Sequence, residues 1–343
     1  MTKRSQMNMV NASWCGFVIL LLVASLLGAC ASLPDTSGYT AATIQVKQAV
    51  AATGDIVEGE LRSAIKSKAT TANDESVKNL KAAWAATTRS LDAMVAHAQS
   101  IEQIVDAGNR GEKSAKEVAD SVKNLVDAVK VDALTGASAK LVELSVDTVA
   151  FVYGEYSKHV AAKSLEEALD KFGPSIAKIT ALIQSQIADA RRLFVEQIEA
   201  QVQLLQSPTL TPEDVGNRFG DWIKRHGELE ETAELATRLL VRGIKDDKPN
   251  DIAKAKAMIS DVETGRKMVA PRLVEYKEMK RSIHQRERAG CSVIGASEKS
   301  VAAWGMAHQQ LLKAVKGRKP VSVESLTATV VEIRTLIQRW REL

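Results

Sequence analysis

The sequence predicts an all-α protein: an elongated antiparallel bundle of about seven to eight helices, several of them long and coiled-coil-like. Apolar residues recur at spacings of three, four and seven through most of the chain after residue 39, which is the period of helices that pack along one face. Apolar residues make up 45% of the chain but aromatic residues only 4%, so Ala, Val, Leu and Ile must build the core. Short polar segments separate the periodic stretches, which favours antiparallel neighbours.

The first half of the chain contains four predicted helical regions. The first runs from about Tyr39 to Lys68, and the second begins near Asp74 and ends at "AGNRGEK", where two glycines supply a stop. The third region covers about Glu112 to Phe172, with a break near Gly136. Pro174 follows "FG" and is predicted to lie in the first turn of the fourth helix, a position that tolerates proline.

The second half begins at "SPTLTPED", where Thr211 is a predicted cap and Pro212 the first helical residue of the fifth helix. "KDDKPND" ends that helix. We expect a kink at Pro271 in the next one, and we interpret "RAGCSVIGAS" as a loop. The remaining helices are predicted at about Asp251–Arg288, Ser297–Lys316 and Val323–Glu342.

An apolar segment near the N-terminus is predicted to be a secretion signal. It follows Lys3 and Arg4, and its apolar part runs for 14 residues from Trp14 to Leu27. A helix that spans a bilayer needs about 20 apolar residues, so this segment is too short to cross one. A basic start, a short apolar segment and small residues before a boundary are typical of a cleaved signal. We therefore expect residues 1–29 to be removed.

The boundary itself, Leu27-Gly28-Ala29-Cys30, resembles the lipobox of bacterial lipoproteins. The resemblance implies a diacylglycerol on the sulfur of Cys30, cleavage before Cys30 and acylation of the new amino terminus. Two or three acyl chains form a stable membrane anchor. Residue 31 is Ala31 rather than Asp, which in Gram-negative families implies the outer membrane, here facing the periplasm. An uncleaved anchor and an ordinary signal with an unrelated cysteine are the alternatives.

The charge of the chain is unevenly distributed. Residues 30–265 contain 28 Lys and Arg against 35 Asp and Glu, whereas residues 266–343 contain 16 against 7. We divide the processed chain into a lipidated cysteine with its tether (30–38), an acidic long-helix bundle (39–206) and a second helical region with a basic C-terminal part (207–343). A basic end favours an anionic partner such as lipid headgroups, lipopolysaccharide, an anionic glycan or the acidic half of another copy. A solvated face is the alternative.

Five basic residues form the charge cluster of most interest for binding. They lie on the predicted sixth helix, whose apolar stripe is interrupted there, so this part is expected to pack less deeply and to present its charge outward. We predict a surface for an anionic partner, and solvated charge is again the alternative. The residues are Lys277, Lys280, Arg281, Arg286 and Arg288.

The sequence contains no recognisable catalytic or metal-binding motif. Its five histidines are too far apart for a local pair of zinc ligands, and His226 and His308 fall on apolar stripes, where hydrogen-bonded core or boundary residues are expected. No glycine-rich phosphate loop and no Gly-x-Ser-x-Gly turn is present. We predict no catalytic residue, metal or cofactor. Cys291, the one thiol outside the signal and the lipobox, is expected to be buried, with an intermolecular disulfide as the alternative.

These observations predict a non-enzymatic, lipid-anchored envelope protein with a binding or scaffolding role. Its expected partners are the membrane, other envelope proteins or an anionic envelope polymer, and another copy, whereas the export signal disfavours nucleic acid. One alternative is a membrane-active protein that inserts Leu134–Tyr156. Lys140, Glu143 and Asp147 interrupt that segment, and a charge at bilayer depth is costly. The other alternative is an enzyme with an unrecognised site between helices.

Overall fold

The structure, a computed structural model, confirms the all-α fold. It describes residues 34–66, 74–108, 111–130, 137–160, 162–207, 219–317 and 319–343, and for residues 60–66 and 74–77 the backbone alone. These parts of the chain form helices and no strand. The helices are α2 (Ser37–Lys66), α3 (Asp74–Asp106), α4 (Glu112–Ala128), α5 (Ala139–His159), α6 (Leu165–Gln206), α7 (Gly220–Lys245), α8 (Pro249–Gly317) and α9 (Glu324–Arg341).

Several predicted features fall outside the described residues. They are the signal segment with Leu27, Gly28, Ala29 and Cys30, the cap and first turn at Thr211 and Pro212, and the break at Gly136. The chain does leave the helical state between α4 and α5, as expected.

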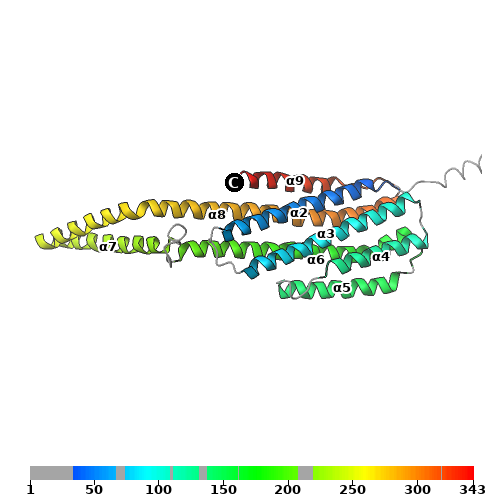
Figure 1. Ribbon diagram of the computed structural model, residues 1–343, viewed down its shortest axis with the longest axis horizontal. Coiled ribbons are helices and arrows are strands. Elements are labelled where there is room, and N and C mark those ends of the chain that lie inside the picture. The colour runs from blue at the N-terminus through cyan, green and yellow to red at the C-terminus, as the bar shows by residue number, and fades with distance from the viewer. Residues whose placement is uncertain are drawn as a thin grey trace, which may run out of the picture.

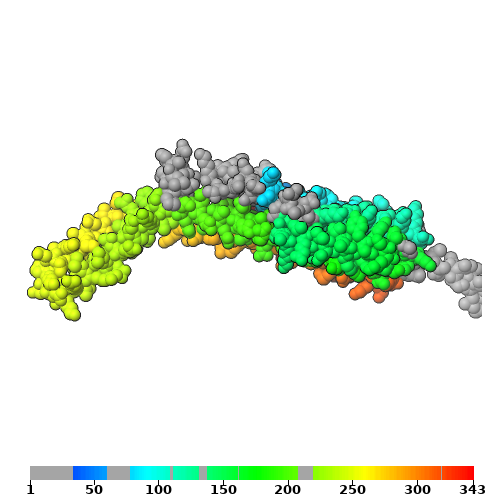
Figure 2. Space-filling view, turned by 90° about the horizontal axis from the view of Figure 1, so that it is seen from below, coloured from blue at the N-terminus to red at the C-terminus, as the bar shows by residue number. Residues whose placement is uncertain are grey.

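The molecule is a long bundle from which one helical hairpin projects. Helices α2 to α6, the C-terminal half of α8, and α9 lie side by side, whereas α7 and the N-terminal part of α8 extend beyond one end (Figure 1). Figure 2 shows the resulting gently arched shape. With 69 residues, α8 is about 100 Å long at 1.5 Å per residue. The start of α2 and the turn between α7 and α8 lie at opposite ends of the molecule (Figure 1).

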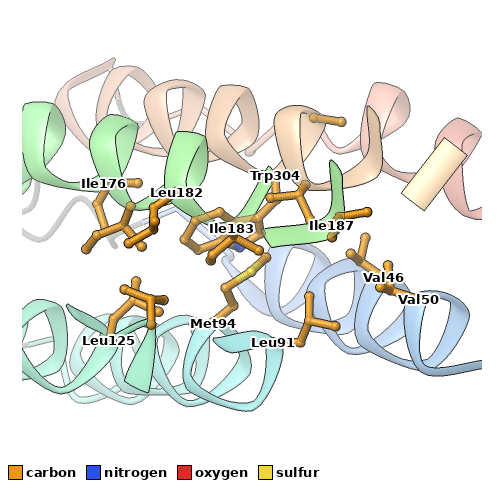
Figure 3. Packing of buried hydrophobic residues seen from close by; sticks show 14 of the residues in the cluster. Val46, Val50, Leu91, Met94, Leu125, Ile176, Leu182, Ile183, Ile187 and Trp304 are labelled. Atoms are coloured by element: carbon orange, nitrogen blue, oxygen red, sulfur yellow. The ribbon is translucent and has the colours of Figure 1, made fainter. Parts of the chain in front are cut away.

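The core runs along the bundle and contains few aromatic rings. Trp304 of α8, Phe172 and Phe194 of α6, and Tyr39 of α2 are fully buried among aliphatic residues. Helices from both predicted regions of the chain contribute, because α8 and α9 pack against α2, and α8 also packs against α6. Figure 3 shows side chains from five helices converging, namely Val46, Val50, Leu91, Met94, Leu125, Ile176, Leu182, Ile183, Ile187 and Trp304.

The fourth predicted helix begins earlier than expected, so the interpretation of Pro174 was wrong. Helix α6 starts at Leu165 and runs through Pro174 without a break. Its start is set by Ser164, whose side chain accepts a hydrogen bond from the backbone N–H of Glu167 at 3.1 Å, as in a capping box. Pro174 is exposed, so water reaches the backbone carbonyl that its ring leaves without a partner.

The sixth and seventh predicted helices are one helix, so the loop predicted at "RAGCSVIGAS" was also wrong. Helix α8 continues through Pro271 and Gly290, and its buried residues Ala255, Val262, Val269, Ile283 and Gly290 lie seven or fourteen positions apart, which places them on one side of the helix. A Cβ atom at Gly290 would lie 2.7 Å from the ring of Phe194. This glycine therefore allows close helix packing and does not end the helix.

The two helices of the hairpin, α7 and α8, are also packed closely at a glycine. A Cβ atom at Gly265 of α8 would lie 2.6 Å from Leu229 of α7, so the two helices approach closely there. The hairpin turns at Asp247, whose backbone has a left-handed φ of 52°. The N–H of Lys248 donates to the carbonyl of Gly243 at 2.8 Å, which closes the C-terminus of α7.

Candidate functional site

Three of the five predicted basic residues share one exposed face of α8. Lys277, Arg281 and Arg288 are spaced by four and seven residues, a pattern that places side chains on the same side of a helix. At 1.5 Å per residue the three span about 17 Å along the helix axis. All three are exposed, near the point where the hairpin leaves the bundle.

The other two predicted residues, Lys280 and Arg286, lie elsewhere on the helix. Both are half-buried, and the Nζ atom of Lys280 is 5.9 Å from the centre of the Tyr276 ring. Arg286 follows Met279 by seven residues and precedes the buried Val293 by seven, which places it on the packed side of α8. The structure therefore separates the five-residue cluster into an exposed line of three and two packed side chains.

His284, whose side chain is 41% exposed, lies between Arg281 and Arg288 on the same side of α8, and we call Lys277, Arg281, His284 and Arg288 the basic stripe. His284 follows Lys277 by seven residues, and its Nδ1 atom is 3.0 Å from Oε2 of Glu287. His284 was not among the predicted residues, because those were chosen by proximity along the chain. A search by helical position would have included it.

Among the members of the basic stripe, only His284 has a carboxylate partner within the described chain, Glu287 at 3.0 Å. Within the described chain, no ion pair involves the side chains of Lys277, Arg281 or Arg288, although α7 and the hairpin contain several, including Arg238 with Glu234 and Arg266 with Glu230. Like charges one turn apart on a helix repel each other. The isolated protein therefore gains no stability from this arrangement, whereas an anion placed along the stripe would relieve the repulsion.

A buried histidine pair is the second notable polar cluster. His97 of α3 and His308 of α8 are 1% and 2% exposed, and their Nε2 atoms lie 3.2 Å apart. The Oγ atom of Ser121 on α4 lies 2.8 Å from Nδ1 of His97. The ring of Trp304 packs edge-on against His97. Three helices thus meet at a chain of hydrogen bonds inside the core.

The hydrogen bonds fix the protonation of the pair. Ser121 donates its one hydroxyl proton to the carbonyl of Val118 at 2.8 Å, so it accepts from Nδ1–H of His97. Nε2 of His97 is then the acceptor for Nε2–H of His308. Burial lowers the pKa of His97 well below its usual value, as does the proximity of His308, and burial lowers the pKa of His308 to about 4. Both rings are neutral at pH 7.

Sequence reasoning missed this pair because 211 residues separate its members. His308 was correctly placed on an apolar stripe, but His97 was not singled out, although it lies three residues after Met94 and four before Ile101 on its own buried face. A third histidine, His226, is only half-buried on α7, with Nδ1 3.7 Å from Glu230.

Neither a metal site nor a reactive thiol emerges from the described part of the chain. No group of three or more His, Cys, Asp and Glu side chains there is arranged to hold a metal ion. Cys291 lies on α8 and is half-buried, and burial raises the pKa of its thiol despite the nearby Arg191. A raised pKa disfavours the nucleophilic thiolate.

The segment proposed for membrane insertion forms the peripheral helix α5 from Ala139 onward. Glu143 and Asp147 are exposed on it, while the polar Ser145 and Thr148 are among the residues on its buried face. Among the described helices, none is both long enough and apolar enough to cross a membrane.

No protein family, curated protein or solved structure matches this chain. Its function must therefore be argued from its own residues and geometry.

Proposed function

We propose that the chain is a non-enzymatic, lipid-anchored scaffold protein of a bacterial envelope, most simply on the periplasmic face of an outer membrane. The observation that carries the proposal is the position of the two ends in Figure 1. The chain enters the bundle at the start of α2, a few residues after the lipobox cysteine Cys30, and the α7–α8 turn lies at the far end. An anchor at one end and a projecting arm at the other suit a protein that holds a partner at a distance from its attachment point.

The exposed apolar side chains of the hairpin favour a protein partner, because no other part of the described chain covers them. Leu235, Val241 and Ile244 of α7 are 57%, 62% and 62% exposed, and Met268 of α8 is 54% exposed. Large exposed apolar side chains that gather on one projecting element favour an interaction site. The partner would be another envelope protein or a second copy of this chain.

The scaffold proposal also accounts for the composition of the interior. The bundle buries hydroxyl, amide and imidazole groups that hydrogen-bond to one another, including Ser90 with Gln186 and Thr53 with Ser297. Such contacts position helices, and in the described chain no three or more His, Cys, Asp and Glu side chains are arranged to hold a metal ion. A structural role for the buried polar groups is the simplest account of their geometry.

The test of the anchor is the variant Cys30→Ser. Wild-type protein is expected in the membrane fraction, and the variant is expected either in the soluble fraction or as an unprocessed precursor. A variant that is processed and fractionates like the wild type would refute the lipid anchor.

The test of the arm is photo-crosslinking from matched positions. A photoreactive residue replaces Val241 on the hairpin or, as control, Val146 on α5; the two valines are 62% and 61% exposed. We expect a discrete adduct from position 241 that is absent from position 146 and is lost when Cys30→Ser removes the protein from the membrane. Equal adducts from both positions, or none from 241, would rule out the hairpin as the docking element.

A further inference from the structure

We propose that the face of α8 that carries the basic stripe binds the anionic headgroup surface of a phospholipid bilayer, so that the rod lies along the membrane. The inference rests on the proposed function insofar as the anchor at Cys30 brings this face to a membrane. The binding chemistry itself belongs to the folded body and can be measured without the lipid.

The side of α8 that carries the stripe extends well beyond it. Positions on this side of α8 from residue 274 to 306, at spacings of three and four, contain no Asp or Glu. They are Val274, Lys277, Arg281, His284, Arg288, Ser292, Gly295, Lys299, Ala302 and Met306. Of the four Lys and Arg residues, only Lys299 has an ion-pair partner, Glu332 of α9, within the described chain. The positions of this face are therefore basic or neutral over about 48 Å, and two carboxylates lie beside it, Glu287 against His284 and Glu332 against Lys299.

Exposed apolar side chains at both ends of this face favour a lipid surface over a soluble polyanion. Val274 is 54% exposed and Met306 is 51% exposed. A helix face that combines basic residues with exposed apolar ones can place the charges at the headgroups and the apolar groups at the acyl boundary. A soluble anionic polymer would use the three cations but would leave both apolar side chains in water.

A second copy of the chain is a poorer match for this face than a bilayer. Among the described helices, α7 has the densest exposed acidic side, with Glu228, Glu231 and Glu234 spaced by three residues. Two of these carboxylates already face cations of the same helix, since Glu228 lies 3.8 Å from Lys224 and Glu234 lies 2.6 Å from Arg238. This side of α7 therefore mixes both signs of charge, whereas the headgroup surface of an anionic bilayer does not.

Membrane binding through this face would set the direction of the hairpin. The stripe lies about 45 to 60 Å along α8 from Gly317, at the anchored end, so an upright molecule would hold it beyond the reach of the headgroups. A molecule lying on the membrane brings the stripe into contact and points the α7–α8 hairpin sideways, parallel to the surface. The partner of the hairpin would then be met close to the headgroups.

The test is vesicle cosedimentation with the chain from residue 31 onward, which contains every described residue and no lipid. Vesicles of phosphatidylglycerol and phosphatidylcholine in equal parts are compared with phosphatidylcholine alone. The test variant combines Lys277→Gln, Arg281→Gln and Arg288→Gln. The control combines Lys116→Gln, Lys140→Gln and Lys163→Gln, which removes the same charge from exposed positions on α4, on α5 and just before α6.

We expect the wild type and the control to bind the anionic vesicles and not the neutral ones, and the test variant to bind on the order of 100-fold more weakly, as expected for three basic contacts at an anionic surface. The variant Val274→Ser with Met306→Ser should also bind these vesicles more weakly. Because all these side chains are exposed, circular dichroism should show unchanged helix content in each variant.

Two outcomes would overturn the proposal. The first is equal loss of binding in the test and control variants, which would reveal a response to net charge alone. The second is a wild-type protein that does not cosediment with the anionic vesicles. Binding of soluble inorganic polyphosphate by that protein would then assign the basic stripe to a soluble anionic polymer. Neither outcome bears on the anchor, which is judged separately by the fractionation of Cys30→Ser.

Discussion

The buried pair of His97 and His308 should make the fold sensitive to mild acid. The pKa of His308 is about 4 in the folded protein and about 6.5 when the side chain is in water. Between these values the unfolded chain binds a proton that the folded chain rejects. The stabilising contribution is therefore complete above about pH 6.5 and is lost as the pH falls towards 4. His97 shifts in the same direction and adds to the effect.

The size of the effect follows from the two pKa values of His308. The interval between about 6.5 and about 4 corresponds to about 3 kcal/mol of unfolding free energy, of which about 2 kcal/mol is lost by about pH 5. Protonation of His97 at Nε2 would also bring two N–H groups face to face across the 3.2 Å contact with His308. The bond between α3 and α8 would then be replaced by a repulsion.

Urea unfolding followed by circular dichroism at pH 7.5 and pH 5 measures this loss. His308→Gln keeps an amide that can donate to His97 and cannot titrate, so its stability should fall less between the two pH values, by about 2 kcal/mol. His226→Gln, at a half-exposed position on α7, is the control and should respond as the wild type does. If His308→Gln and the wild type lose equal stability, the buried pair does not govern the acid response.

Three further predictions on the helix geometry are tested by the same unfolding assay. Gly290→Ala should destabilise the protein by about 1 kcal/mol because its Cβ atom meets aromatic rings. Gly295→Ala, where the structure leaves open space, should stabilise it by about 0.5 to 1 kcal/mol. Stability changes of the same sign in both variants would contradict the packing. Asp247→Gly should stabilise the hairpin by about 0.5 kcal/mol because of the left-handed backbone there, and Asp246→Gly, with φ of −97°, should not. Ser164→Ala should cost about 1 kcal/mol by removing the cap of α6, and an unchanged stability would show that α6 does not depend on it.

The helical class could be predicted from periodicity alone, but helix ends could not be predicted from proline and glycine alone. Pro174 was interpreted as the first turn of a helix, and the segment that contains Gly290 as a loop; proline and glycine both weaken isolated helices. In the folded protein Pro174 faces solvent, where its cost is smallest, and Gly290 faces Phe194, where a side chain would not fit. The true start of α6 was readable at Ser164 and Glu167, a Ser-x-x-Glu pattern that local capping chemistry explains.

The polar clusters show a different limit. Part of the basic stripe could be predicted because its members lie close together in the sequence. The angular position of each residue around α8 would also have separated Lys277, Arg281 and Arg288 from Lys280 and Arg286. The histidine pair depends on which helices become neighbours and at what register, information that one amphipathic stripe does not contain. Periodicity indicates which face of α3 or α8 is buried, but not which residue lies opposite.

Buried polar contacts explain how so regular a bundle can keep one register. A seam of Ala, Gly, Ser and Val at three- and four-residue spacing would pack almost as well after a slip of seven residues. A slip would leave buried hydrogen-bonding groups without partners, and each such group would lower the stability of the fold by about 1 to 3 kcal/mol. The contacts that a slip of α8 or α3 would break are Thr53 with Ser297 at 2.9 Å, Ser90 with Gln186 at 3.0 Å and His97 with His308 at 3.2 Å. Because two of these three hold α8, they also determine where along the bundle the basic stripe lies and how far the hairpin projects.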